Sequence, residues 1–593
     1  MKTRMQVKKR FHIPLIWLGV LTLAGAQAGA STDVGPELIR NGGFEEAFST
    51  QGVAKGWGDN SAWAPVEVRY SDETTAIHAG GHAQKIECNL FKGGAVQFSQ
   101  PGISVIRGGV YRISLWMKGS LDSLVEIQLR KEPAPYTTYA SRLFNVSERW
   151  TRYSFDGVCQ ETDPAAMLII RFGSTGVLNL DEVSCRQVGS QGRAIRLQPP
   201  AKVIPSTYFG MHLHRNCPNY LIWPQTTFGA LRLWDSMVSW PQLEPEQGKW
   251  EFARLDQYLD QAEAHQVEVL LPLGLTPKWA SARPEEKSAY NSSNVSRETG
   301  WAAEPRDFAD WDQYVRTVAT HCKGMVHVYE VWNEPDNVPF YSGTVEQLAE
   351  LTRRAARIVK EVDPANRIVS PANSGSLMYL DNFLKKGGGK PVDMVGFHFY
   401  VWPEPPEKMV PEILNVREIM ERHGVGSRPL WNTESGWYIE SKIQPPPAAA
   451  YHGQTPLSIQ VAGDYIARAY LLNWAAGVER YYFYAWDNGL MGLVEKDGTL
   501  KAAAQAYTEV YRWMVGARMD SCEADDGGTW TVRLTRPGER RAFVAWNPEK
   551  EVSLKLIGDR RAVRVRDLSG AVRPVVAGEP VKIGSSPLYF EAN

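Results

Sequence analysis

The chain has 593 residues, which is too long for a single domain and suggests about three or four. It contains 65 Lys and Arg against 66 Asp and Glu, so charge offers no electrostatic case for a nucleic-acid partner. The 21 Trp and 24 Tyr supply large flat side chains that fill cores and also stack on ligands.

Residues 1–30 have the layout of a signal peptide. MKTRMQVKKR is a basic start, PLIWLGVLTLAGA is an apolar run, and AQAGA offers cleavage after Ala28 or Ala30. An uncleaved membrane anchor is the weaker alternative, because the apolar run is shorter than the ~20 residues that a span needs. No cysteine follows for lipid attachment, and no later stretch is typical of a membrane span. We therefore expect a soluble exported protein, secreted or periplasmic.

The six cysteines are scattered and contain no CxxC pair, which argues against a zinc site built from them. Export would permit disulfide bonds, but the sequence does not give their connectivity. They are Cys88, Cys159, Cys185, Cys217, Cys322 and Cys522.

Residues 31–190 alternate short β-rich runs with Gly, Pro and Asn turns, which predicts an antiparallel β-sandwich. The segments LIRNGGFEE, Gly56-Trp57 and LNLDEVSC resemble those of jelly-roll carbohydrate-binding modules found beside glycosidases. The resemblance implies Glu45 and Asp181 as candidate ligands of a structural calcium ion. A sandwich that only packs against its neighbour is the alternative.

Residues 205–510 alternate strands with helical stretches, which indicates βα units and a parallel sheet. Eight such units in about 300 residues predict a (β/α)8 TIM barrel. Residues 516–593 return to short β-runs and predict a small C-terminal β-sandwich, in which we recognise no chemistry. The expected barrel strands are YFGMHLH, ALRLWD, VEVLLPLG, HVYEVWNEP, RIVSPAN, MVGFHFY, PLWNTESG and RYYFYAWD.

Polar residues stand at the carboxyl ends of these strands, where a TIM barrel carries its active site. Glu334 follows the fourth strand and Glu434 the seventh, so two glutamates should face each other across the barrel mouth. Arginine, histidine and tyrosine side chains between them complete a constellation suited to hydrolysis. The candidates are His212, His214, Arg232, Asp235, Asn333, Glu334, His398, Tyr400, Glu434, Trp486 and Asp487.

WNEP, HFY and NTESGW at these positions resemble the retaining glycoside hydrolases of clan A, closest to family 39 and related exopolysaccharide hydrolases. The resemblance implies Glu334 as general acid/base and Glu434 as nucleophile, with Asn333 binding the sugar 2-hydroxyl.

The residues support the same division of roles. Arg232 and Tyr400 are expected to keep Glu434 charged, and the apolar flanks of Glu334 are expected to raise its pKa. Trp486 would form the apolar floor under the sugar, with packing at the barrel mouth as the alternative. His212 would contact substrate or pack in the barrel, and His398, Arg232 and Tyr400 would contact substrate.

A metal-dependent amidohydrolase is a rival suggested by the histidines. WNEP and SPAN lack the Lys and His ligands that it needs, and it leaves both glutamates unexplained. We therefore expect no metal or cofactor in catalysis.

The extra sandwich and the aromatic loops favour an endo-acting polysaccharide hydrolase. Two other hypotheses on the same scaffold stay open. One is an exo-acting β-xylosidase-like enzyme, and the other is an inactive carbohydrate-binding protein, which the two intact glutamates argue against. The expected partner is a polysaccharide or oligosaccharide whose sugar the sequence does not identify. Candidate platforms for it in the loops are Trp279, Trp301, Trp402 and Trp437.

Overall fold

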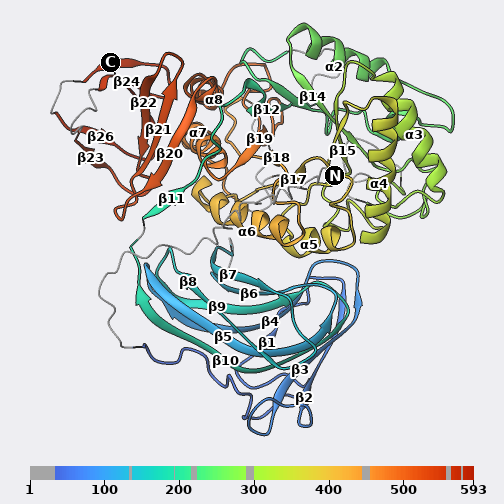
Figure 1. Ribbon diagram of the computed structural model, residues 1–593, viewed down its shortest axis with the longest axis vertical. Helices are drawn as coiled ribbons and strands as arrows, with labels where there is room; N and C mark the ends of the chain where they lie inside the picture. The colour runs from blue at the N-terminus through green and yellow to red at the C-terminus, as the bar shows by residue number, and fades with distance from the viewer. Residues whose placement is uncertain are drawn as a thin grey trace, which may run out of the picture.

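The computed structural model describes residues 34–132, 136–192, 194–214, 223–288, 299–443, 446, 450, 454–555, 562–575 and 579–592. The predicted signal peptide and Cys217 lie outside these residues. Figure 1 shows a β-sandwich in blue and teal below a barrel of helices and strands, with a sheet in red beside the barrel. Within the described residues no helix is both long and apolar enough to cross a membrane.

The sandwich consists of two antiparallel sheets of five strands each. Alternate residues of its strands point inward, so that Leu168 and Ile170 of β9 pack on Val125 and Ile127 of β6 in one apolar core. The sheet nearer the barrel is ordered β1 (Gly58–Asp59), β4 (Val96–Val105), β9 (Asp163–Phe172), β6 (Val125–Arg130) and β7 (Thr138–Phe144), and the other is β2 (Val66–Glu73), β3 (Ala83–Phe91), β10 (Gly176–Ser190), β5 (Gly109–Leu121) and β8 (Thr151–Val158).

The barrel has the predicted eight parallel strands, in the predicted order. The hydrogen-bonded order of the strands begins with β16 and ends with β17. Bridges between Val369 and Met394 and between Asn373 and Phe397 join these two ends and close the barrel. The strands are β12 (Phe209–His212), β13 (Ala230–Arg232), β14 (Glu268–Leu273), β15 (Val328–Val331), β16 (Arg367–Val369), β17 (Val395–Phe397), β18 (Leu430–Ser435) and β19 (Val478–Phe483).

Helices cover the outside of the barrel (Figure 1). Their buried apolar side chains pack on its strands in one core. Helix α4 begins at Val345 because Thr344 caps it. The Thr344 side chain accepts from the Gln347 amide, and the Gln347 side chain accepts from the Thr344 amide. The helices are α1 (Trp240–Leu243), α2 (Ala253–Ala264), α3 (Phe308–His321), α4 (Val345–Val362), α5 (Leu377–Lys385), α6 (Met409–Arg422), α7 (Ile459–Ala475) and α8 (Ala502–Met514).

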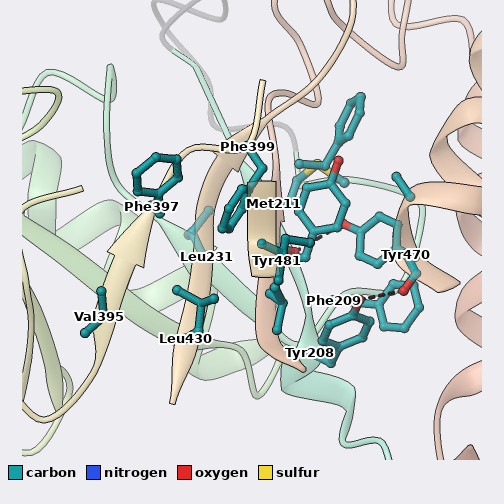
Figure 2. Packing of buried hydrophobic residues seen from close by; sticks show 14 of the residues in the cluster. Tyr208, Phe209, Met211, Leu231, Val395, Phe397, Phe399, Leu430, Tyr470 and Tyr481 are labelled. Carbon is teal, nitrogen blue, oxygen red and sulfur yellow. Dashed lines mark hydrogen bonds between the residues drawn. The ribbon is translucent and has the colours of Figure 1, made fainter. Parts of the chain in front are cut away.

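Aromatic rings fill the space between the strands and α7. Figure 2 shows Phe209 of β12 beside Tyr470 of α7, and their ring centroids lie 4.4 Å apart in a stacked pair. The Tyr208 hydroxyl donates to the Tyr470 carbonyl at 2.6 Å, which ties the start of β12 to the helix. This packing fixes strand positions from the outside and leaves the carboxyl ends of the strands for polar residues.

The C-terminal part forms a seven-stranded sheet backed by a two-stranded one, with a small apolar core around Phe543 and Phe590. Strand β11 (Ile195–Leu197) belongs to the segment that joins the sandwich to the barrel. It pairs with β20, so this sheet is linked to both the sandwich and the barrel. The remaining strands are β20 (Arg518–Ala524), β21 (Trp530–Arg536), β22 (Arg540–Trp546), β23 (Val552–Leu554), β24 (Ala562–Arg566), β25 (Val572–Pro574), β26 (Val581–Ile583) and β27 (Leu588–Ala592). The five cysteines among the described residues are buried and free.

Candidate active site

Arg232, at the end of β13, is the centre of a polar network inside the barrel mouth. Its Nε donates to Glu330 Oε2 at 2.6 Å, its Nη1 to Glu434 Oε2 at 2.9 Å, and its Nη2 to Asn333 Oδ1 at 2.8 Å. The Arg232 side chain is fully buried, so its charge acts on these acceptors with little screening by water. One guanidinium therefore joins strands β13, β15 and β18.

Glu434 lies near the end of β18 and receives a donor on each oxygen. Oε2 accepts from Arg232, and Oε1 accepts from the Tyr400 hydroxyl at 2.9 Å. Only 7% of the residue is exposed. Both donors favour its ionised form and hold it in one orientation.

Glu334 has a different environment, since its one side-chain partner in the described structure is His398, whose Nδ1 lies 3.0 Å from Oε1. Burial, with a smaller contribution from Arg232, lowers the pKa of His398 to about 4, so its ring is neutral at pH 7. Nε2 of His398 is buried with no partner in the described residues. A bare lone pair there costs less than a stranded N–H, so we assign the proton to Nδ1, where it is donated to Glu334.

An irregular backbone turns two consecutive side chains into the same site. In an ordinary strand, Asn333 and Glu334 would point to opposite faces. Here Trp332 and Glu334 adopt left-handed conformations, with φ of 61° and 48°, and the Glu334 amide donates to the Ala372 carbonyl. Such conformations are costly for residues other than glycine and cluster at functional sites, where the surrounding structure holds them.

Burial raises the pKa of both glutamates to about 7. Arg232 opposes this shift at both, while each carboxylate also faces a negative neighbour: Asp235 beside Glu334, and Glu334 beside Glu434. Two close buried carboxyls do not ionise independently, so the proton stays with the one that has fewer donors. Glu334 has fewer donors, so we expect it to hold the proton while Glu434 stays ionised.

Oxygens of Glu334 and Glu434 and a nitrogen of His398 all lie within 4.8 Å of one another. Carboxyl groups about 5–5.5 Å apart are typical of retaining glycosidases, and inverting ones need about 6.5–9.5 Å. By distance the three side chains could also hold a metal ion, and the hydrogen bonds described above account for the same atoms without one.

Two other predicted residues stand behind this site. His212 is fully buried, and its Nε2 lies 3.0 Å from the carbonyl oxygen of Thr433, the residue before Glu434. Trp486 is 5% exposed and packs in the barrel core, with its backbone N–H on the His212 carbonyl. Their predicted contact with sugar stays a prediction, since the structure shows them supporting β18 and β12.

Sequence reasoning missed three members of the site. Glu330 has no exposed side-chain surface and shares Arg232 with Glu434. The Tyr484 hydroxyl donates to Asp235 Oδ2 at 2.6 Å. Asp336 accepts from the amides of Ser374 and Ser376, which anchors the loop after Glu334. The sequence does contain a pattern that indicates Glu330, because it is a charged residue inside an apolar run and lies four residues before Glu334.

The predicted calcium ligands, Glu45 before β1 and Asp181 within β10, both bind the loop between β2 and β3. Glu45 accepts from the amides of Gly81 and His82, and Asp181 accepts from those of His78 and Ala79. A calcium ion there would have to displace these N–H donors. Its presence stays a prediction, which melting temperatures measured with calcium and with a chelator would check.

Comparison with known families matches two parts of the chain. Residues 229–445 match the model of the glycosyl hydrolases family 39, and residues 36–175 match that of a carbohydrate binding domain. The first range contains Arg232, Glu334, Tyr400 and Glu434. These matches confirm the predicted resemblance of the barrel to family 39 and of the sandwich to a carbohydrate-binding module.

Curated relatives match shorter stretches. A β-xylosidase from Caldicellulosiruptor saccharolyticus is 29% identical over 144 residues, and one from Geobacillus stearothermophilus is 28% identical over 212 residues. The alignments cover 23% and 31% of this chain, and 29% and 40% of the relatives. The chain thus matches well under half the length of either relative.

A solved structure shares the fold over most of the chain. It is a family 39 glycoside hydrolase from the gut symbiont Bacteroides cellulosilyticus WH2, with a TM-score of 0.50 and 16% identity. The match covers 81% of this chain and 98% of that one. The barrel architecture is therefore shared with a family 39 protein at low sequence identity.

Proposed function

We propose that the protein is an exported retaining glycoside hydrolase that cleaves β-glycosidic bonds of a polysaccharide or oligosaccharide by double displacement. The observation that carries this proposal is the pair Glu334 and Glu434, with carboxyl oxygens within 4.8 Å and unequal donors. Export rests on the signal-like residues 1–30 of the sequence.

In the first step, an oxygen of Glu434 attacks the anomeric carbon while Glu334 gives its proton to the glycosidic oxygen. The carbon–oxygen bond breaks, the alcohol leaves, and a glycosyl-enzyme ester remains on Glu434. His398 occupies Oε1 of Glu334, so the transferable proton is carried by Oε2. An electron pair of the Glu434 carboxylate forms the new bond, so its negative charge is lost and the hydrogen bonds from Arg232 and Tyr400 weaken.

In the second step, Glu334 is ionised and takes a proton from water, whose oxygen attacks the anomeric carbon from the vacated face. The ester bond breaks and Glu434 returns to its carboxylate form. Arg232 occupies Oδ1 of Asn333, which leaves the amide NH2 group to donate to the sugar 2-hydroxyl. Configuration at the anomeric carbon is inverted twice and so retained.

Substrate length separates two forms of this proposal. The carbohydrate binding domain match at residues 36–175 favours action on a polymer, while the two curated relatives carry the name β-xylosidase and favour release of single xylose units. Mass spectrometry of the products from a polysaccharide panel distinguishes a ladder of oligosaccharides from monosaccharide alone.

Stereochemistry tests the mechanism directly. The protein is incubated with an aryl β-glycoside, and proton NMR follows the anomeric signal before mutarotation. We expect the β-anomer to appear first, and first appearance of the α-anomer would exclude double displacement. An inactive carbohydrate-binding protein would release no aryl alcohol at all.

Catalysis by this route uses carboxyl groups alone, and we expect a chelator to leave the rate unchanged. Zinc ions should inhibit by binding Glu334, His398 and Glu434, and the chelator should reverse that inhibition. A rate that falls on chelation and recovers with added zinc but not with calcium would contradict the proposed route.

A further inference from the structure

The sandwich carries both of the strongly exposed aromatic side chains in the described part of the protein. Trp63 is 59% exposed and Tyr136 is 48% exposed. The other aromatic residues described are buried or half-buried. A large apolar ring left in water is a candidate for a binding surface when it stands beside a functional site.

Trp63 is connected to the loop that carries Glu334 through one turn of the sandwich. It lies between β1 and β2, and its ring packs against Gly94 in the turn between β3 and β4. The preceding residue, Gly93, contacts Val338 of the barrel, four residues beyond Glu334. Ala95, the residue after Gly94, is fully buried within the barrel's own apolar cluster.

This turn has room for glycine only. A Cβ on Gly93 would lie 2.5 Å from a methyl carbon of Val338, and one on Gly94 would lie 2.9 Å from the Trp63 ring. Both glycines also have φ values that other residues rarely adopt, at 154° and 74°. The close fit fixes Trp63 relative to the barrel.

The same sandwich borders two more loops at the barrel mouth. Gly173 lies against Met378, at the start of α5, and the Thr137 hydroxyl donates to Glu404 in the loop after β17 at 2.9 Å. Figure 1 shows the sandwich against the side of the barrel formed by α5 and α6. These contacts place the sandwich along the sector of the mouth that follows β15, β16 and β17, the sector of the proton donor.

We propose that Trp63 is a platform for sugar units on the leaving-group side of the bond that is cleaved. This inference rests on the proposed function, because Glu334 must protonate the leaving oxygen and so stands beside the leaving sugars. A sugar ring presents a face of C–H groups that packs on an indole. The sandwich then adds a subsite to the barrel's active site, rather than only tethering it to a polymer.

Two substrates and three variants of the full-length protein test this. The substrates are an aryl β-glycoside and an oligosaccharide of several units, both of the sugar that the wild-type protein hydrolyses. Trp63→Ala removes the platform and Trp63→Phe keeps an aromatic ring. Ile106→Ala is the matched control, since Ile106 is a 48% exposed apolar residue elsewhere in the same sandwich.

We expect Trp63→Ala to raise KM for the oligosaccharide about 3- to 10-fold, as loss of one stacking contact does, with kcat little changed. Trp63→Phe should recover most of this loss, and Ile106→Ala should behave as wild type. Hydrolysis of the aryl glycoside should be unchanged in all three variants, because it has no sugar on the leaving-group side.

An unchanged KM for the oligosaccharide in Trp63→Ala, with intact aryl-glycoside hydrolysis, would overturn this inference alone. An equal loss on both substrates would also overturn it, since it would assign Trp63 a structural role. If the wild-type protein hydrolysed no aryl glycoside, the proposed function would fail, and the inference with it.

Discussion

Nη1 of Arg232 lies 2.9 Å from Oε2 of Glu434, while Nε of the same guanidinium lies 2.6 Å from Glu330. One buried positive charge thus serves two buried carboxylates. The negative charge of Glu330 partly cancels the field of Arg232 at Glu434. The pKa of Glu434 therefore depends on Glu330, which does not contact it.

Removing the Tyr400 hydroxyl should shift the acid limb of the pH profile. In Tyr400→Phe, Glu434 loses the donor on Oε1, its ionised form is less stable, and its pKa rises. Because the nucleophile must be ionised, kcat/KM should begin to fall at a higher pH, by about one unit for one hydrogen bond to a charged group.

Tyr208→Phe is a suitable control for that variant, since its hydroxyl is also buried and hydrogen-bonded but lies at the start of β12. It should leave both limbs in place. An acid limb that does not move in Tyr400→Phe would remove Tyr400 from this role.

Glu330→Gln should shift the same limb in the opposite direction. Glutamine keeps an oxygen to accept from Arg232 Nε but removes a negative charge, so Arg232 acts more fully on Glu434. The pKa of Glu434 then falls, and kcat/KM should persist to lower pH than in the wild type.

Glu509→Gln provides a matched control, because Glu509 is also fully buried and paired, with Arg512, but on α8. An upward shift of the acid limb in Glu330→Gln would show that Glu330 acts by orienting Arg232, and not through its charge.

The alkaline limb should report Glu334. Burial raises its pKa to about 7, and only the protonated form donates to the leaving oxygen, so kcat/KM should fall as the pH rises through about 7. A dinitrophenyl glycoside needs no proton for departure, so its alkaline limb should be much weaker. An equal limb with both substrates would assign that titration to another group.

The sequence was sufficient for the barrel because its signals are local. Each strand is a short apolar run, and the two glutamates follow such runs directly, so the topology of a TIM barrel brings them to one mouth. Tyr400 and Arg232 could be placed for the same reason. Both side chains contact Glu434 at 2.9 Å, while the catalytic roles of the two glutamates stay predictions.

Other features depend on contacts that no local pattern shows. Side chains alternate between the two faces of a regular strand, and this alternation is broken at Trp332 and Glu334. The face on which Glu330 lies therefore does not follow from its spacing to Glu334. The position of Trp63 depends on Gly93 meeting Val338, a contact between residues 245 apart in the chain. Tertiary packing decides both.

Azide should separate the two glutamates by the configuration of the product. Glu434→Ala removes the nucleophile, so hydrolysis should be lost for every substrate, however good the leaving group. Glu334→Ala removes proton donation and base assistance, worth about 10²–10⁴-fold each, and a dinitrophenyl glycoside should still form the glycosyl-enzyme.

Azide is small enough to enter the space that either substitution leaves, and it needs no base because it is already an anion. In Glu334→Ala it should attack the glycosyl-enzyme on Glu434, giving a β-glycosyl azide with retained configuration. In Glu434→Ala it can only replace the leaving group directly, from the face that the nucleophile used, giving the α-glycosyl azide. Proton NMR of the isolated azides distinguishes the anomers. Exchanged products would mean that the acid/base and the nucleophile are assigned the wrong way round, and undiminished hydrolysis in both variants would exclude the glycosidase mechanism at this site.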